Sequence, residues 1–96
     1  MRVLPLSVPP EHPAFEGHFP GAPILPGVVL LDEAIRAIES AGDGARLWRI
    51  VSVKFLRGVG PGTPLVLEHE PLASGAVRFT VSSGGRPVAA GMLAPA

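Results

Sequence analysis

The chain has 96 residues, of which 47% are hydrophobic and 17% are charged, a composition typical of globular proteins and not of disordered ones. Eight basic residues balance eight acidic ones, which argues against binding to the phosphate backbone of a nucleic acid. There is no cysteine, so disulfide bonds and thiol nucleophiles are excluded.

The length predicts a single domain over residues 1–96. A chain this short leaves much apolar surface uncovered, so we expect burial against a second copy. The longest fully apolar run, residues 28–31, is far shorter than the ~20 residues of a membrane-spanning helix. Prolines interrupt the N-terminal apolar stretch and make it a poor secretory signal. We therefore expect a cytoplasmic protein.

The N-terminal half predicts a strand, a long loop and a helix. Residues 3–8 form the strand, which Pro5 confines to a sheet edge or a bulge. The loop of residues 9–26 is rich in proline and glycine, and loops of this length are usually functional or disordered. Apolar spacing predicts a helix that begins near Gly27 and stops at glycines 42 and 44, with its first turns buried nearly all round. Asp32 and Glu33 then lie near the positive end of the helix dipole.

The C-terminal half predicts four strands. Residues 46–57 carry apolar side chains on both faces, which indicates a central strand. Strands at 65–72, 76–82 and 87–93 are separated by small, glycine-containing segments typical of hairpin turns. His69 lies between Glu68 and Glu70 and is expected at the surface. The element order predicts an α+β fold, a curled antiparallel sheet of about five strands with one helix on its concave face.

His18 and Asp32 are the candidates for chemistry. His18 lies in the stiff segment GHFPGAPILPG, and its ordinary pKa suits a base near neutrality. Asp32 follows fourteen residues later among apolar neighbours, where burial raises a carboxyl pKa and favours an acid role. A base and an acid on opposite sides of a substrate suit an elimination of water. Alternatively, His18 is a structural loop residue and Asp32 only a dipole partner of the helix.

The segment GHFPGAPILPGVVLLD resembles the signature of the 3-hydroxyacyl-[acyl-carrier-protein] dehydratases, the FabA/FabZ group with the hotdog fold. Weaker similarity follows through VKFLR and the later Pro-Gly turn. The resemblance implies that His18 is the catalytic base and Asp32 the catalytic acid, supplied to one active site by different subunits of a homodimer or higher even oligomer. It also implies that the backbone N–H of Gly27 binds the thioester carbonyl. The histidine segment is similar to the glutamate branch of the family and the aspartate to the other branch, which leaves double-bond isomerisation open.

The implied substrate is a 3-hydroxyacyl thioester on acyl carrier protein or coenzyme A, and the product a trans-2-enoyl thioester in fatty acid or polyene-type biosynthesis. No metal or organic cofactor is expected, since His12 and His18 have no third ligand nearby. Candidates for the wall of an acyl tunnel, which ordinary core packing explains at least as well, are Phe19, Leu25, Val28, Leu31 and Phe55. Pro26 and Gly27 are further candidate substrate-binding residues. Arg49, Lys54 and Arg57 are candidates to meet an acidic carrier at the mouth of the site.

Two rival functions stay open. A hotdog acyl thioesterase would use a carboxylate and water, and would not need the loop histidine. A non-catalytic subunit would bind the acyl chain or its carrier, for example as the inactive half of a heterodimer. Retention of both His18 and Asp32 disfavours the second rival.

Overall fold

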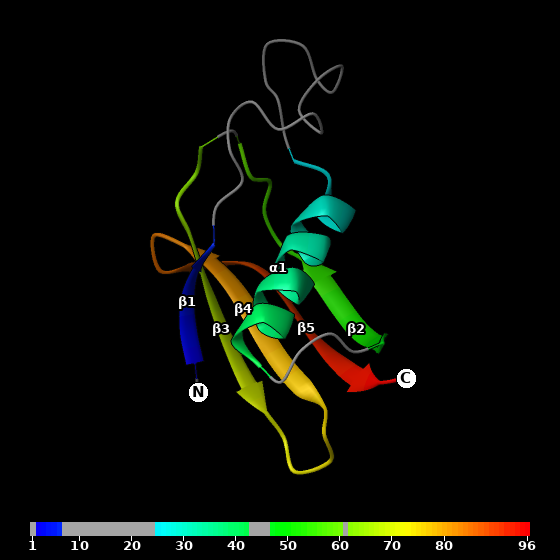
Figure 1. Ribbon diagram of the computed structural model, residues 1–96. Helices are drawn as coiled ribbons and strands as arrows, with labels where there is room; N and C mark the ends of the chain where they lie inside the picture. The colour runs from blue at the N-terminus through cyan, green and yellow to red at the C-terminus, as the bar shows by residue number, and fades with distance from the viewer. Residues whose placement is uncertain (1, 7–24, 43–46, 61) are drawn as a thin grey trace.

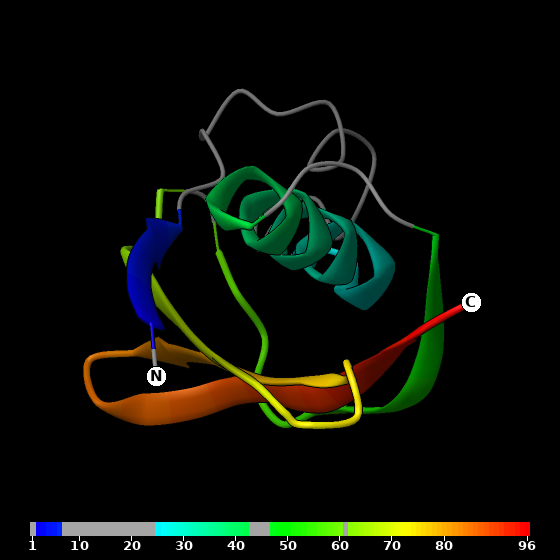
Figure 2. The same cartoon turned by 60° about the horizontal axis from the view of Figure 1, so that its bottom comes forward.

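The computed structural model describes residues 2–6, 25–42, 47–60 and 62–96 (Figure 1). They form five strands and one helix: β1 (Arg2–Leu6), α1 (Gly27–Ala41), β2 (Trp48–Phe55), β3 (Leu65–Pro71), β4 (Val77–Ser83) and β5 (Arg86–Pro95). The strands build one antiparallel sheet in the order β1-β3-β4-β5-β2. Figure 2 shows the sheet curled beneath α1, with β1 and β2 rising on either side of it. The predicted hotdog architecture is confirmed, and the sheet is open.

Helix α1 begins at Gly27, as predicted, after Pro26 as its N-cap residue. Proline suits this position because the N–H that it lacks would have no partner in a first helical turn. Leu30, Leu31, Ala34 and Ile38 are the buried residues of the helix and give it one apolar face toward the sheet. The helix ends at Ala41, where the Arg2 side chain donates a hydrogen bond to the Ala41 carbonyl and ties β1 to the helix end.

Two expectations for α1 are wrong. The first turn contains no acidic residue, and Asp32 is the sixth residue of the helix, beyond the turn in which the dipole acts strongly. The first turns are also not buried all round, because Val28 is 71% exposed within the single chain. The apolar run at the helix start therefore includes surface that this chain does not cover by itself.

The core lies between the apolar face of α1 and the inner face of the sheet. Its cross-strand rows follow from the registers: Leu67 pairs with Val81, which pairs with Ala89, and Val77 pairs with Leu93. Phe79, Leu67, Leu93 and Val81 are the largest fully buried side chains. Alternate residues of β3 and β4 are buried, as expected for strands with one face on a core.

The expectation that residues 46–57 form a central strand is wrong. β2 pairs with β5 alone among the described strands, and its other edge is free. A bulge between Ile50 and Ser52 shifts the alternation, so that Ile50 and Val53 both lie on the inner face, opposite Leu93 and Gly91. The bulge therefore explains why the alternation in the sequence places apolar residues on both faces. The position of β2 at the edge of the sheet explains why several of these residues are exposed. Along β2 and its flanks, Leu47, Ile50, Val51, Phe55 and Leu56 are between 46% and 82% exposed.

The other strand predictions hold. β1 is an edge strand, as Pro5 requires. Tight turns join β3 to β4 and β4 to β5, and three glycines take up positive φ angles there: Gly75, Gly84 and Gly85. No helix in the described ranges combines the length and the apolar character needed to cross a membrane.

The expectation that His69 lies at the surface is wrong, because it is only 4% exposed. It follows Leu65 and Leu67 at alternating positions of β3 and so shares their buried face. Glu68 and Glu70 point to the opposite face of the strand, so their charges give no information about the surroundings of His69. Burial lowers the pKa of His69 below its ordinary value of 6.5, and the charges of Arg2 and the amino terminus act in the same direction. Its buried Nε2 has no hydrogen-bond partner among the described residues.

Gly91→Ala tests the close packing of β5 against its neighbours. A Cβ atom at residue 91 would overlap the Ser52 carbonyl oxygen and lie 2.9 Å from Phe79 Cζ. We expect the substitution to lower the free energy of unfolding by about 1–3 kcal/mol, measured by denaturant titration. Gly42→Ala is the matched control, since its new Cβ meets nothing closer than the Ile38 carbonyl oxygen at 3.4 Å. Equal effects of the two substitutions would contradict the packing described here.

His69→Leu tests the burial of the histidine. A lowered pKa in the folded state means that the unfolded chain takes up a proton first as the pH falls below about 6.5. The free energy of unfolding of the wild type should therefore decline through that range, down to the lowered pKa of the folded state. We expect His69→Leu to reduce this decline in chemical denaturation between about pH 7.5 and pH 5. Identical pH dependence of variant and wild type would show that His69 titrates freely.

Candidate active site

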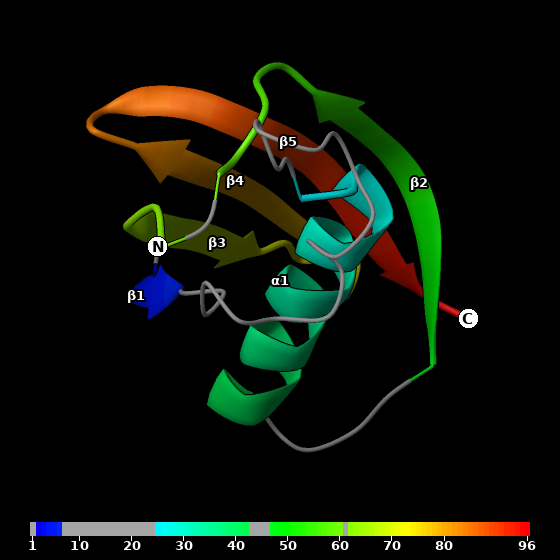
Figure 3. The ribbon, with the colours of Figure 1, turned by 90° about the horizontal axis from the view of Figure 1, so that it is seen from above.

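An open cleft of about 350 Å³ lies where the start of α1 meets the end of β2. Its lining residues are Leu25, Gly27, Leu30, Phe55, Leu56, Arg57, Gly58 and Val59. Figure 3 shows the N-terminal end of α1 beside β2. The volume is within the range of small-molecule sites, and most of the lining is apolar. The cleft therefore has the size and character to receive a short apolar chain.

Backbone hydrogen bonds fix both walls of the cleft. The Leu25 N–H donates to the Val59 carbonyl at 2.8 Å and holds the approach to α1 against the segment after β2. On the other wall, the Leu56 N–H donates to the Val88 carbonyl at 2.8 Å. The helix start is thus held in a defined position relative to the strand end, which suits a site that must align a substrate.

Gly27 is the first residue of α1 and lines the cleft. The Pro26 carbonyl accepts hydrogen bonds from the N–H groups of Val29 and Leu30, at 3.0 and 3.2 Å. The Gly27 N–H, in contrast, has no carbonyl one turn earlier in the helix to donate to, and it lies at the positive end of the helix dipole. Gly27 therefore presents a backbone donor of the kind that binds a carbonyl oxygen or a developing oxyanion.

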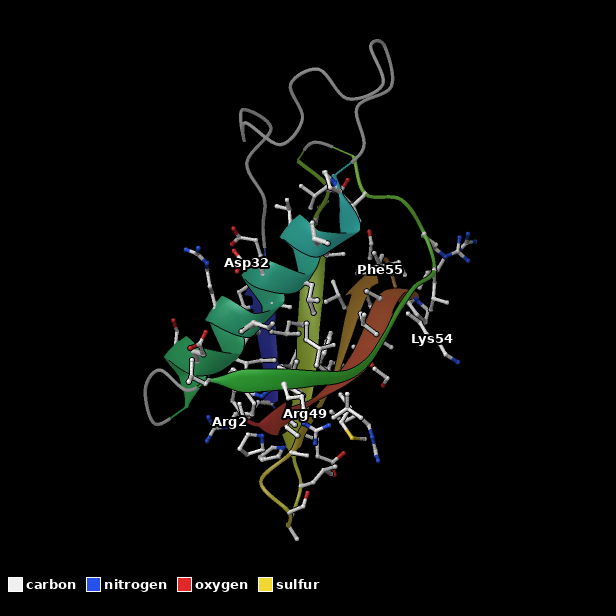
Figure 4. All side chains as sticks on the ribbon, turned by 90° about the vertical axis from the view of Figure 1, so that its right-hand side faces the viewer. Arg2, Asp32, Arg49, Lys54 and Phe55 are labelled. Carbon is white, nitrogen blue, oxygen red and sulfur yellow. The ribbon has the colours of Figure 1, made fainter. Side chains whose placement is uncertain are left out.

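Asp32 lies outside the cleft, and the expectation that it is buried among apolar residues is wrong. Its side chain is 56% exposed and accepts a hydrogen bond from Arg36 Nε at 2.9 Å, one helical turn further on. Figure 4 shows Asp32 on the opposite side of α1 from Phe55. The apolar residues beside Asp32 in the sequence point to other faces of the helix. Glu33, the next residue along the helix, is half-buried.

The other predicted site residues divide into three groups. Gly27, Leu25 and Phe55 line the cleft, as does Arg57, the one charged residue among its described lining. Pro26 immediately precedes the helix, whereas Leu31 is buried in the core and Val28 points to solvent. His18 and Phe19 lie outside the described residues. Their roles, and the pairing of His18 with Asp32, stay predictions.

Of the three basic residues expected at the mouth, only Arg57 borders the cleft. Arg49 and Lys54 are exposed on the outer face of β2, opposite Ala94 and Ala90 of β5. Lys54 lines a separate, shallow groove there together with Arg78. Figure 4 shows Lys54 and Arg49 spaced along β2.

Four lining residues are not among the predicted site residues: Leu30, Leu56, Gly58 and Val59. The sequence predicts Leu30 only as part of the apolar start of the helix. Leu56, Gly58 and Val59 lie where the predicted strand meets the predicted turn. For Val59 the sequence did contain a sign of burial, because an apolar residue between two glycines is unusual for a solvated turn. In the structure Val59 is only 3% exposed.

Comparisons with known proteins identify the family of the chain. The family model described as ApeI dehydratase, ApeI-like, matches residues 2–92. The 3-hydroxyacyl-[acyl-carrier-protein] dehydratase FabZ of Thermus thermophilus is 40% identical over an alignment of length 72, with 66% of this chain and 51% of the relative covered. FabZ of Acetivibrio thermocellus is 39% identical over 71 residues, with 66% and 49% covered. The chain thus spans about half the length of the curated relatives that it matches.

Solved structures give the same fold. The dehydratase heterocomplex ApeI:P from Xenorhabdus doucetiae matches with a TM-score of 0.78 and 26% identity, over 96% of this chain and 83% of that one. A point mutant of the fluoroacetyl-CoA-specific thioesterase FlK matches with a TM-score of 0.63 and 18% identity, over 97% and 84%, a likeness of fold alone. On the match over residues 2–92, the chain belongs to the ApeI-like dehydratase family.

Proposed function

We propose that this chain catalyses the dehydration of a 3-hydroxyacyl thioester to the trans-2-enoyl thioester. The observation that supports this most strongly is the apolar cleft that opens on the backbone donor of Gly27 at the start of α1, in a member of a dehydratase family. Such a donor stabilises the charge that develops on a thioester carbonyl when the proton on C2 is removed. The FabZ relatives, named as acyl-carrier-protein dehydratases, support a carrier-bound substrate.

In the proposed reaction, His18 takes the proton from C2 and the electron pair moves toward the thioester carbonyl. The Gly27 N–H donates to that carbonyl oxygen, a contact worth about 2.7–4 kcal/mol in other enzymes. The C3–O bond then breaks, and Asp32 gives its proton to the departing hydroxyl, which leaves as water. The double bond forms between C2 and C3. A proton has moved from C2 to His18 and another from Asp32 to the water, so one proton transfer between them resets the enzyme.

The active site is proposed to form between two subunits. Asp32 and the cleft do not meet within one chain, and the free edge of β2 exposes apolar side chains that water disfavours. A second copy paired along this edge would extend the sheet and cover those side chains. Because the Xenorhabdus dehydratase is a heterocomplex, a different hotdog subunit is the alternative occupant of the same edge.

A dehydration assay tests the proposed function. The protein is incubated with a 3-hydroxyacyl pantetheine thioester, while enoyl absorbance and free thiol are followed in parallel. We expect enoyl product without thiol release. His18→Ala and Asp32→Asn should each lower kcat by roughly a hundredfold or more, since general acid–base groups contribute about 10²–10⁴.

Folding controls accompany both variants. Asp32→Asn should change the free energy of unfolding by less than about 1 kcal/mol, because its ion pair with Arg36 is exposed to solvent. A folded His18→Ala protein with wild-type turnover would remove His18 from the mechanism. Thiol release without enoyl product would identify a thioesterase, and purified protein inactive alone but active with a second hotdog subunit would identify a heteromeric enzyme.

A further inference from the structure

The ring of Phe55 is packed against the first residue of α1. A Cβ atom at residue 27 would lie 3.0 Å from Phe55 Cε1 and Cζ and 3.1 Å from Cδ1. These distances are shorter than ordinary contacts between carbon atoms. The absence of a side chain at Gly27 is therefore what allows the ring to lie beside the start of the helix.

The backbone of Phe55 is fixed, while its ring remains partly open to the cleft. Phe55 pairs with Ala89 at the end of β2, and the next residue, Leu56, donates its N–H to the Val88 carbonyl at 2.8 Å. The side chain lines the cleft, and Phe55 is 46% exposed. The ring thus forms a wall of the cleft at a defined distance from Gly27.

We infer that Phe55 selects substrates that are unbranched at C2. This inference rests on the proposed function, in which the Gly27 N–H binds the thioester carbonyl oxygen. C2 is bonded to the carbonyl carbon, so it must lie close to that N–H and share the space beside Gly27 with the ring. A hydrogen atom on C2 fits there, whereas a methyl group competes with the ring for the same volume.

The position of the ring also separates this role from control of acyl chain length. Phe55 lies beside the atoms that bind the thioester head, and the more buried lining is supplied by Leu25, Leu30 and Val59. A smaller residue at position 55 therefore makes room near C2 and leaves that buried lining in place. Chain-length preference should be nearly unchanged when discrimination at C2 is lost.

The test compares 3-hydroxybutyryl pantetheine with its 2-methyl derivative in the wild type, Phe55→Ala and Phe55→Leu. One methyl group in an apolar pocket changes kcat/KM by roughly 10–200-fold, so we expect the wild type to favour the unbranched substrate by at least about tenfold. Both variants should bring the ratio of kcat/KM for the unbranched to the 2-methyl substrate closer to one, and Phe55→Ala should do so more than Phe55→Leu. Leu56→Ala, which removes an adjacent lining side chain that is not among the atoms nearest to the Cβ position of Gly27, should leave the ratio as in the wild type. Equal ratios in wild type and Phe55→Ala would overturn the inference.

A binding measurement separates failure of this inference from failure of the proposed function. Butyryl and 2-methylbutyryl pantetheine carry no 3-hydroxyl group and differ only by the methyl branch at C2, so titration calorimetry reports selection without turnover. If the wild type dehydrates nothing, the proposed function fails. A preference for butyryl that is lost in Phe55→Ala would still support the role of Phe55. Binding of neither probe, or equal binding of both by the wild type, would overturn it.

Discussion

The free edge of β2 is the feature on which the proposed site depends. This strand pairs with β5 on one side, whereas its other side pairs with none of the described strands and is flanked by exposed Leu47, Val51 and Leu56. Exposed apolar edges invite pairing with another chain. The cleft opens at the end of the same strand, through Phe55. A subunit paired along this edge, as proposed, would therefore also border the cleft, so assembly and substrate binding would involve the same few residues.

Gly27 links the fold to the proposed chemistry. It starts α1 after Pro26, it lines the cleft, and its lack of a Cβ atom admits the ring of Phe55. The contact of Leu25 with Val59 and that of Leu56 with Val88 hold the two walls at a fixed separation. Precise placement of this kind matters for catalysis, because a shift of about 1 Å in a reacting group can lower a rate by a hundredfold.

The sequence predicted those parts of the molecule that depend on local signals. Proline before Gly27 located the helix start, and glycines located both hairpin turns. It misplaced residues whose environment depends on distant partners. A bulge and an uncovered edge gave β2 the apolar pattern of a central strand. The charged neighbours of His69 in the sequence suggested exposure, whereas His69 is buried. The apolar neighbours of Asp32 suggested burial, whereas they face other directions on the helix and Asp32 is exposed. The cleft lining after Leu56 depends on how the segment that follows β2 packs against the approach to α1, which the local sequence does not indicate.

Complementation between two inactive variants tests the central claim, that the base and the acid of one site come from different copies. His18→Ala and Asp32→Asn proteins are mixed in equal amounts, allowed to exchange subunits, and assayed for enoyl product. In a two-fold symmetric dimer, half of the pairs are mixed and each holds one intact site, so activity should return to about one quarter of the wild type. If the mixture stays as inactive as its parts while subunit exchange is demonstrated, the two groups do not act across the interface.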